Sequence, residues 1–419
     1  METTRHARHW WVLGALLCGL VAGTLLGRPN VATTLHVAGS VVGSIGTLWL
    51  NALRMTVAPL VFALLVSAVG GVADAMATGR LATRAIAWFV ALLVFAGLVS
   101  IVLSLVLLAL WPVDATTAAG FIAGVAHESA HVAVAPMDWS QFLRALVPPN
   151  IFAAAADNAI LALVVFATLL GFATTRLPAA LRNTLLQFFT AVAEAMVVIV
   201  HWVLWLAPVG VFALALGVGQ QAGLRAAGLL LHYAAFVALV IALATLAPYA
   251  IVALRRSALF GRFVREMAPV QVVAVSTQSS LATLPAMIDC ARDRLGVTPR
   301  VANLLLPFAV AVFRYTSPIG NLAVCVFIAA LYGLQPSLLQ YAVAIGVAFA
   351  ISVGTVGLPG QVSFIASIAP ICAALGLPVD MLGILVAVEI LPDIFRTIGN
   401  VTADVAVAVV VDTGDDTGG

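Results

Sequence analysis

The chain has 419 residues, of which 63% are apolar and 9% charged, and this balance excludes an ordinary soluble globular protein, which is nearer half apolar and a quarter charged. The formal net charge of +2, without any cluster of basic and aromatic residues, gives no indication of a nucleic-acid partner. The composition predicts an all-α polytopic membrane protein, built as one bundle of spanning helices in contact with lipid.

Six apolar runs in the first 255 residues predict ordinary membrane-spanning helices. The runs cover residues 10–27, 36–72, 85–112, 150–173, 184–218 and 225–254. The second and fifth runs are longer than an upright helix needs, so we expect them to be tilted, bent or extended beyond the bilayer. In the first run Gly19, Gly23 and Gly27 recur every four residues, which is typical of a face that packs closely on another helix.

The arginines indicate which side of the membrane each loop occupies. All 19 basic residues are arginine, and with the N-terminus inside, 13 of them fall in cytoplasmic segments against three in external segments. Such an excess of positive charge is typical of the cytoplasmic side. We therefore expect a multi-pass protein of the cell inner membrane, with the N- and C-termini in the cytoplasm.

Beyond residue 264 the apolar runs are interrupted by polar, glycine and proline residues. Run 264–297 is split at 276–280, run 299–333 at 314–318, and run 337–376 at 354–360. The pieces of the first and third runs are too short to span a membrane, which predicts two re-entrant hairpins around a broken seventh span. Irregular backbone at membrane depth lines a cavity, and its free amides and carbonyls bind solutes and ions. The arginine pattern makes the hairpins enter from opposite sides, with a solute site between their tips.

The final span, residues 379–411, carries a row of polar side chains. Glu389, Asp393, Arg396, Thr397, Asn400 and Asp404 are spaced by three or four residues, so they share about a third of the helix circumference. Ionisable groups at this depth are costly unless paired, and they mark a site or pathway. We interpret Arg396 as the group that binds a carboxylate through two hydrogen bonds, and Asp393 as the partner of a substrate ammonium. Asn400 and Asp404 would offer oxygens to a small cation, with sodium at Asp404 as the candidate. The alternative is a structural ion pair between Asp393 and Arg396.

These motifs resemble the dicarboxylate/amino acid:cation symporter family, which includes glutamate and aspartate transporters. Residues 278–285, QSSLATLP, resemble the serine-rich tip of that family's first hairpin, and residues 357–360, GLPG, resemble the tip of the second. The segment from Asp393 to Asp404 is similar to the family's last-helix signature. Residues 55–62 and 207–213 add to the similarity, which covers nearly the whole chain.

The resemblance implies a homotrimer with an elevator fold of eight transmembrane helices plus two re-entrant helical hairpins. Residues 1–255 would form the scaffold and trimer interface, with part of the third span near the transport core, residues 256–411 the mobile core, and residues 412–419 a disordered tail. Arg396 would bind the distal carboxylate of the solute and Asp393 its amino group. The implied pocket is completed by Ser279, Ser280, Thr316, Leu358, Val362, Thr397 and Asn400.

The chain departs from the family pattern at the cation sites. Where the family has Asn-Met-Asp-Gly-Thr in the broken seventh span, residues 312–316 read VFRYT, so a cation, Arg314, replaces an acidic sodium ligand. The polar ligands expected in the third span are also absent from residues 88–97. We expect that Arg314 stands in for one missing sodium ion and pairs with Glu389. The second cation site, at Asn400 and Asp404, would keep sodium coupling, and proton coupling through Glu389 or Asp404 is the competing hypothesis.

The expected function is secondary active transport: a symporter moving an acidic amino acid or a C4-type dicarboxylate with a cation. Asp393 beside Arg396 favours the amino acid, unless Asp393 is protonated or paired with Arg314. The alternative function is a solute-gated anion channel or a non-transporting sensor on the same scaffold. An enzyme is not expected, because the HExxH pattern at residues 127–131 lies in an external loop without a clear third ligand. No cofactor is expected beyond a bound sodium ion.

Overall fold

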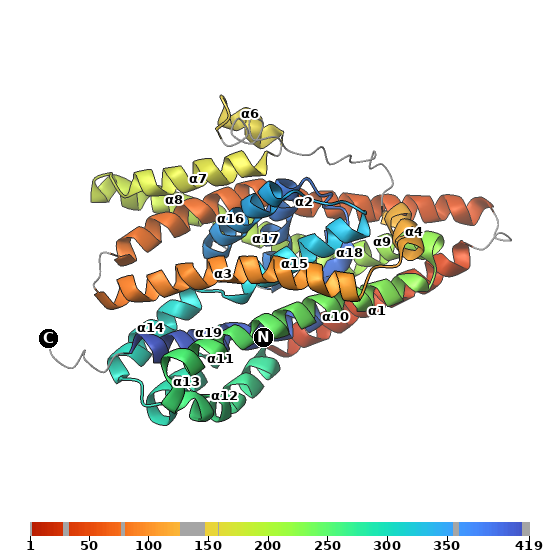
Figure 1. Ribbon diagram of the computed structural model, residues 1–419. Helices are drawn as coiled ribbons and strands as arrows, with labels where there is room; N and C mark the ends of the chain where they lie inside the picture. The colour runs from red at the N-terminus through yellow and green to blue at the C-terminus, as the bar shows by residue number, and fades with distance from the viewer. Residues whose placement is uncertain are drawn as a thin grey trace.

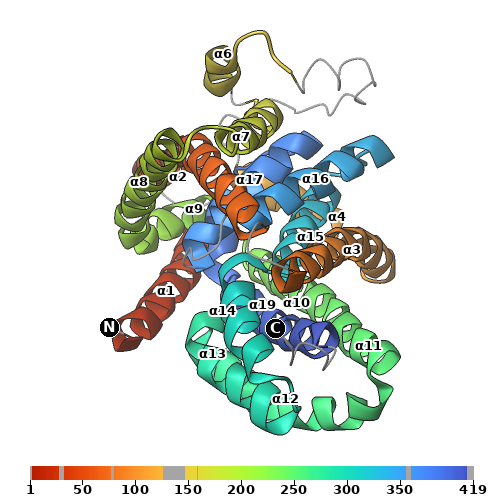
Figure 2. The same cartoon turned by 90° about the vertical axis from the view of Figure 1, so that its left-hand side faces the viewer.

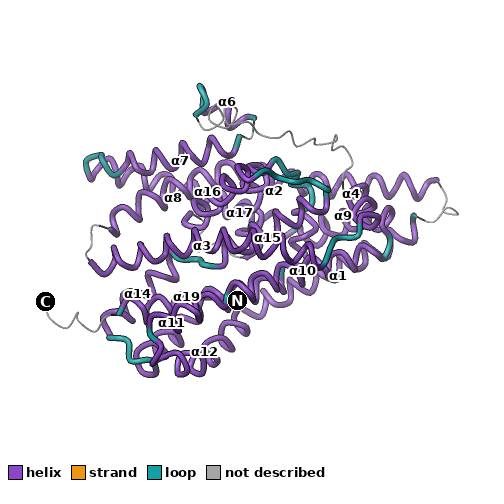
Figure 3. Tube along the Cα trace, in the orientation of Figure 1, coloured by secondary structure: helices purple, strands orange, loops and turns teal. Residues whose placement is uncertain are grey.

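The computed structural model describes residues 2–27, 33–76, 80–125, 147–157, 159–354 and 360–412. Every regular element within these ranges is a helix (Figures 1 and 3). Six of the described helices are long and apolar enough to cross a membrane, and shorter apolar helices accompany them. The predicted all-helical class is confirmed. Three predicted features lie outside the described ranges: the HExxH pattern, the second-hairpin tip at Leu358, and residues 413–419.

The first 255 residues form ten described helices. These are α1 (Glu2–Leu26), α2 (Thr33–Met76), α3 (Arg80–Leu110), α4 (Ala115–Val125), α6 (Ile151–Ala156), α7 (Ile160–Thr174), α8 (Ala179–Trp205), α9 (Ala207–Ala222), α10 (Arg225–Ala244) and α11 (Leu246–Arg255). The predicted span 184–218 is two helices that meet at Leu206, because Pro208 in the first turn of α9 has no amide hydrogen to continue α8. Helix α4 was not expected in a loop.

The remaining helices follow the predicted interruptions. They are α12 (Ser257–Thr277), α13 (Ser280–Asp289) with a π-turn at Cys290–Arg294, α14 (Pro299–Val312), α15 (Thr316–Leu331), α16 (Leu338–Gly354), α17 (Gly360–Leu375), α18 (Leu382–Leu385) with the 3₁₀ turn η2 (Val386–Val388), and α19 (Ile390–Val411). Helix α12 ends where Gln278 adopts a left-handed conformation, with φ +49°, and the Ser279 hydroxyl accepts the amide of Ala282 to start α13. The predicted breaks at 276–280 and 314–318 are confirmed.

The helices pack in two groups. Helix α1 packs along α9, and α2 packs on α7, α8 and α9. In the second group α19 lies within a ring of α10, α11, α12 and α14, and α3 packs on α15 (Figure 2). Helices α10 and α11 precede residue 255, the predicted end of the scaffold, yet their contacts are with α19.

The glycine face predicted on the first helix lies against α9. A side chain at Gly23 would collide with the backbone carbonyl of Leu216, and a side chain at Gly19 would lie 2.6 Å from the backbone oxygen of Phe212. Backbone atoms cannot turn aside as a side chain can. Glycine at these positions therefore allows the two helix backbones to approach closely.

The two groups meet where α2 contacts α16 and α17. Arg54 of α2 donates to the carboxylate of Asp380, in the turn before α18, at 2.6 Å. Both side chains are partly exposed. This ion pair joins residues 326 positions apart in the chain and ties one group to the other.

Candidate functional site

The polar row of α19 is turned into the protein rather than towards lipid. Arg396, Thr397, Asn400 and Asp404 are buried, and Asp393 is half-buried. The regular helix starts at Ile390, so Glu389 lies just before its first turn instead of within a helix running from residue 379. Helix α19 packs on α10, α11, α12, α14 and α15, and hydrogen bonds from Thr316 to Asn400 and from Arg396 to Asn321 place α15 on the polar row. The broken seventh span therefore lies against the polar row.

Arg396 is held by side chains from two other segments. Its Nη2 atom donates to Oε1 of Glu389 at 2.8 Å, and its Nη1 atom donates to Oδ1 of Asn321 at 3.0 Å. The hydroxyl of Tyr233 donates to Oε2 of the same glutamate at 2.9 Å. Charge-assisted hydrogen bonds of this kind are among the strong ones in proteins. A buried guanidinium is thus fixed between α19, α15 and α10.

The position of this guanidinium also depends on a missing side chain. A Cβ atom placed on Gly320 of α15 would lie 2.5 Å from Cζ of Arg396 and 2.6 Å from its Nη1. The guanidinium therefore occupies the space that any other residue at position 320 would fill. Asn321 is oriented by Ser317, because the side-chain amide of Asn321 donates to the Ser317 hydroxyl at 3.3 Å.

Thr316 and Asn400 connect the break in the seventh span to α19. Oδ1 of Asn400 accepts the backbone amide of Thr316 at 2.9 Å and its hydroxyl at 2.9 Å. The Thr316 hydroxyl also lies 3.0 Å from the backbone oxygen of Arg396, and the amide of Ser317 donates to the backbone oxygen of Arg314. These bonds fix the start of α15 on the polar row.

The second arginine, Arg314, lies in the break between α14 and α15. The positive charge of Arg314 is attracted by the carboxylate of Asp393 and repelled by the guanidinium of Arg396. The expected pairing of Arg314 with Glu389 is not the arrangement found, since the two oxygens of Glu389 accept from Arg396 and Tyr233. The aromatic ring of Phe313, in the same break, stacks on Phe89 of α3 at 4.4 Å between ring centroids, and this contact holds the irregular segment.

Asp404 is fully buried, and within the part of the chain that the structure describes neither of its carboxylate oxygens has a hydrogen-bond partner. An anionic carboxylate without donors is costly in an apolar interior. A small cation or a proton would relieve that cost, so the side chain fits the predicted cation-site role. The Asn400 amide oxygen, its predicted co-ligand, already accepts two hydrogen bonds from Thr316.

The first-hairpin tip is described, whereas the second is not. Ser279 and Ser280 are half-buried between α12 and α13, and the hydroxyl of Thr397 donates to the backbone of Asp393 within α19. Leu358 and the side chain of Val362 lie outside the described residues. Of the predicted set, the structure joins Glu389, Arg396, Thr316 and Asn400 by direct or shared contacts.

Two residues of this network were not expected from the sequence. Asn321 and Tyr233 lie in mainly apolar runs and outside the polar row of the final span. Asn321 follows Ser317 by four residues, which places both on one helix face and was a usable signal. Tyr233 gave no comparable signal, because a single tyrosine in a spanning helix has many structural roles.

Comparison with known proteins identifies the relationship. The model of the sodium:dicarboxylate symporter family matches residues 9–413. The proton/glutamate-aspartate symporter of Escherichia coli strain K12 is 28% identical over 98% of this chain and 93% of its own length. The proton/sodium-glutamate symport protein of Bacillus caldotenax is 25% identical over 96% of this chain and 93% of its own length. The human neutral amino acid transporter B(0) is 29% identical over 86% of this chain and 71% of its own length. These relatives are transporters and not enzymes, and the chain belongs to the sodium:dicarboxylate symporter family.

Proposed function

We propose that this protein is a secondary active transporter that moves an acidic amino acid or C4-type dicarboxylate together with a cation across the inner membrane. The observation that carries the proposal is the buried guanidinium of Arg396, held by Glu389 and Asn321 beside the broken seventh span. A planar guanidinium binds a carboxylate through two parallel hydrogen bonds. Two of the relatives are named as glutamate-aspartate and glutamate symporters, which agrees with an acidic solute.

Coupling to a cation follows from the charges at the site. Glu389 neutralises Arg396 at 2.8 Å, so a second carboxylate on this guanidinium adds uncompensated negative charge in a medium of low polarity. A proton on Glu389 restores neutrality. A sodium ion or proton at Asp404, whose oxygens lack donors, is the second route, and the two routes are compatible.

The interaction of Arg314 with Asp393 bears on the class of solute. Asp393 was expected to receive the ammonium group of an amino acid, but the neighbouring positive charge of Arg314 competes for the same carboxylate. This weakens the preference for an amino acid over a dicarboxylate. It also supports Arg314 as the permanent substitute for one family sodium ion, because its charge remains at the site in every state.

A homotrimer with an elevator movement completes the proposal. Helix α8 keeps large apolar side chains exposed along its length, among them Phe188, Trp202 and Trp205. An interface between copies of the scaffold group would cover such a face, leaving the group around α19 to move. Mass measurement of the protein in lipid nanodiscs tests the trimer.

The deciding experiment is uptake of labelled aspartate, glutamate, succinate and malate by reconstituted vesicles, under separately imposed sodium and proton gradients. Accumulation of at least one acid against its own gradient supports the proposal. Arg396→Ala should abolish this uptake while the purified protein remains monodisperse. Uptake unchanged in Arg396→Ala refutes the site assignment, and wild-type flux that never exceeds equilibrium refutes the symporter and favours a channel.

A further inference from the structure

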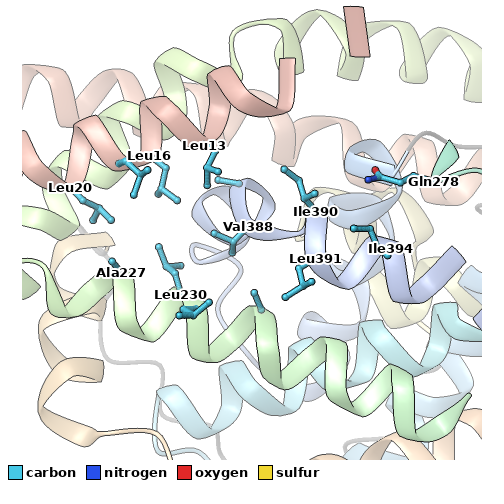
Figure 4. A pocket seen from close by; sticks show the side chains of 14 residues that line it. Leu13, Leu16, Leu20, Ala227, Leu230, Gln278, Val388, Ile390, Leu391 and Ile394 are labelled. Atoms are coloured by element: carbon cyan, nitrogen blue, oxygen red, sulfur yellow. The ribbon is translucent and has the colours of Figure 1, made fainter. Parts of the chain in front are cut away.

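An apolar cavity lies between the two packing groups, beside the segment that carries Glu389. Its volume is about 590 Å³ (Figure 4). One wall is the leucine face of α1 and another is α10, while the residues flanking Glu389, from Ala387 to Leu391, form the third. Gln278, at the tip of the first hairpin, contributes a polar side chain to the lining. The cavity is thus bounded by α1, which packs on α9, and by helices of the α19 group.

The leucines that line the inner end of the cavity are buried, and those at its opening are exposed. Leu16, Leu20 and Leu230 are 2%, 1% and 2% exposed. On the same two helices Leu17 and Leu231 are 51% and 67% exposed. Both helices belong to apolar membrane-embedded segments, so the exposed leucines contact lipid tails. The cavity therefore opens on the lipid-facing surface between α1 and α10.

The side chains that line the cavity indicate which kind of molecule can bind in it. A stable buried water requires two to four polar partners, and the aliphatic walls do not provide them. An acidic solute would lose its hydration without gaining a donor from the leucines. A helix of a partner protein, about 10–12 Å across with its side chains, is too wide for a cavity of this size. A single hydrocarbon chain is narrow enough to enter and can pack against the aliphatic side chains of the walls. Such packing contacts determine affinity between apolar groups in a lipid environment.

We propose that this cavity is a binding site for one acyl chain of a membrane phospholipid, inserted between α1 and the segment that carries Glu389. The chain enters past Leu17 and Leu231, and its end contacts Leu16, Leu20 and Leu230. The headgroup stays outside the cavity. The inserted chain separates the α1–α9 pair from the α19 group and fills the space between them.

An acyl chain between α1 and the α19 group would affect transport, if the protein is the transporter proposed above. If the α19 group moves past α1, the acyl chain can leave or bend, whereas a side chain that permanently fills the cavity cannot. Ala227 of α10 lines the cavity and is partly buried (Figure 4). We expect Ala227→Phe to fill the space now left for lipid, and Ala227→Leu to fill part of it with less risk to folding.

The test uses the full chain in vesicles of phosphatidylethanolamine and phosphatidylglycerol that contain a phosphatidylcholine with a diazirine at the end of one acyl chain. After illumination, mass spectrometry maps the adducts. The proposal predicts adducts on the buried residues Leu16, Leu20 and Leu230 in addition to the exposed Leu17 and Leu231. Labelling of the buried three should fall at least threefold in Ala227→Phe and by less in Ala227→Leu.

The matched control is Val102→Phe on α3, which adds the same ring at a position that is 60% exposed and outside the cavity. It should leave all adducts in place. Adducts restricted to Leu17 and Leu231, or buried adducts that survive Ala227→Phe, overturn the proposal. Labelling requires no uptake, so this result is independent of the symporter assignment. In the uptake arm, a wild-type rate in Ala227→Phe, with buried adducts lost, overturns the spacer role alone.

Discussion

The buried cluster around Arg396 draws one side chain from each of several segments that are distant in sequence. Glu389 precedes α19, Asn321 lies on α15, and Tyr233 lies on α10. Each of these contacts limits where the guanidinium can sit. The position of Arg396, and with it the distance to a bound acid, is therefore a property of three helices rather than of α19 alone.

Gly320→Ala tests that dependence. The added methyl group would meet the guanidinium 2.5 Å away, and since the end of an arginine side chain is flexible, the guanidinium shifts while the fold persists. The shift weakens the bonds to Asn321 and Glu389, which are worth roughly 1.5–3 kcal/mol each when charged. We expect the KM for the acidic solute to rise about tenfold or more in vesicle uptake, with a smaller change in kcat. Gly346→Ala on α16, with open space around its Cβ, is the control, and equal effects in both variants contradict the prediction.

Glu389→Gln tests the proton route. The amide oxygen of glutamine keeps an acceptor for Arg396, and its NH2 group can donate to the Tyr233 hydroxyl, but the side chain cannot take up a proton in exchange for a bound carboxylate. We expect the stimulation of uptake by an inward proton gradient to disappear, while solute exchange without a gradient continues. Tyr233→Phe removes a hydrogen bond at 2.9 Å and leaves the charge, so it should retain the stimulation. Undiminished stimulation in Glu389→Gln would assign the proton elsewhere.

At this scale the sequence was informative about the polar row and less so about its partners. Arg396, Asn400 and Asp404 were recognisable because their spacing follows the helix period. The partner of Glu389 was mispredicted as Arg314, because helix periodicity describes one face and says nothing about which neighbouring segment meets it. The role of Tyr233 became visible only through packing, whereas the spacing of Asn321 from Ser317 was a signal in the sequence.

Helix starts and ends explain where sequence reasoning about elements succeeded. Breaks at Gln278 and at 313–315 coincide with polar residues inside apolar runs, so they could be predicted. The break at Leu206 interrupts a continuous apolar run, and hydropathy does not register a helix end there. The excessive length of run 184–218 and Pro208 within it were the available signals, and a bend was one of the three expected alternatives, beside a tilt and an extension beyond the bilayer.

The close contact between α1 and α9 makes a prediction about assembly. Gly23→Leu places a branched side chain against the backbone carbonyl of Leu216, which has no freedom to move aside. We expect a large loss of monodisperse protein on size-exclusion chromatography and a lower unfolding temperature. Gly14→Leu on the same helix, where nothing lies within 4 Å of the Cβ, should behave as wild type. Similar losses in both variants would mean that α1 tolerates leucine poorly for reasons other than this contact.

Helix α4 provides a prediction with a defined pH range. The carboxylate of Asp114 accepts the hydroxyl of Thr117, the hydroxyl of Thr116 at 2.7 Å and the amide of Thr117 at 2.8 Å, and these bonds lower the pKa of Asp114 from 3.8 to about 2. Because the folded pKa is the lower one, the cap stabilises α4 above about pH 4 and is lost as the pH falls towards 2. Hydrogen exchange at the Thr117 amide, corrected for its intrinsic rate, should therefore accelerate in this range. Asp114→Asn keeps the acceptor without titrating, so acceleration in that variant as well contradicts the prediction.

Across the whole molecule, the ion pair between Arg54 and Asp380 links the two packing groups. No local pattern in the sequence indicates this pair, because Asp380 follows Arg54 by 326 positions. The family resemblance implied the division into a scaffold and a core, with part of the third span near the core, but the placement of α10 and α11 beside α19 came from tertiary contacts. Long-range pairs of this kind are not encoded in any local pattern.

If the core moves relative to α2, the Arg54–Asp380 bond must break in each transport cycle. Partly exposed pairs contribute roughly 0.2–1 kcal/mol, so Arg54→Ala and Asp380→Ala should each change the initial uptake rate by no more than about fivefold. The double variant should match the singles, because the second change has no bond left to remove. The exchanged pair, Arg54→Asp with Asp380→Arg, should return the rate towards wild type. Strictly additive single effects would show that the pair does not act as a unit.

The start of α15 has a consequence for how any anion can be recognised beside it. A helix start ordinarily presents several unbonded amides together with the positive end of its dipole, which is the means by which many proteins hold phosphate or sulfate. Here the amide of Thr316 is bonded to Asn400, that of Ser317 to the backbone of Arg314, and Pro318 has no amide hydrogen. The first three positions of the helix are closed to an oxyanion. If the guanidinium on α19 were replaced by an ammonium group, these three positions could not supply main-chain hydrogen bonds in its place, so recognition of an anion beside α15 depends on the planar geometry of arginine.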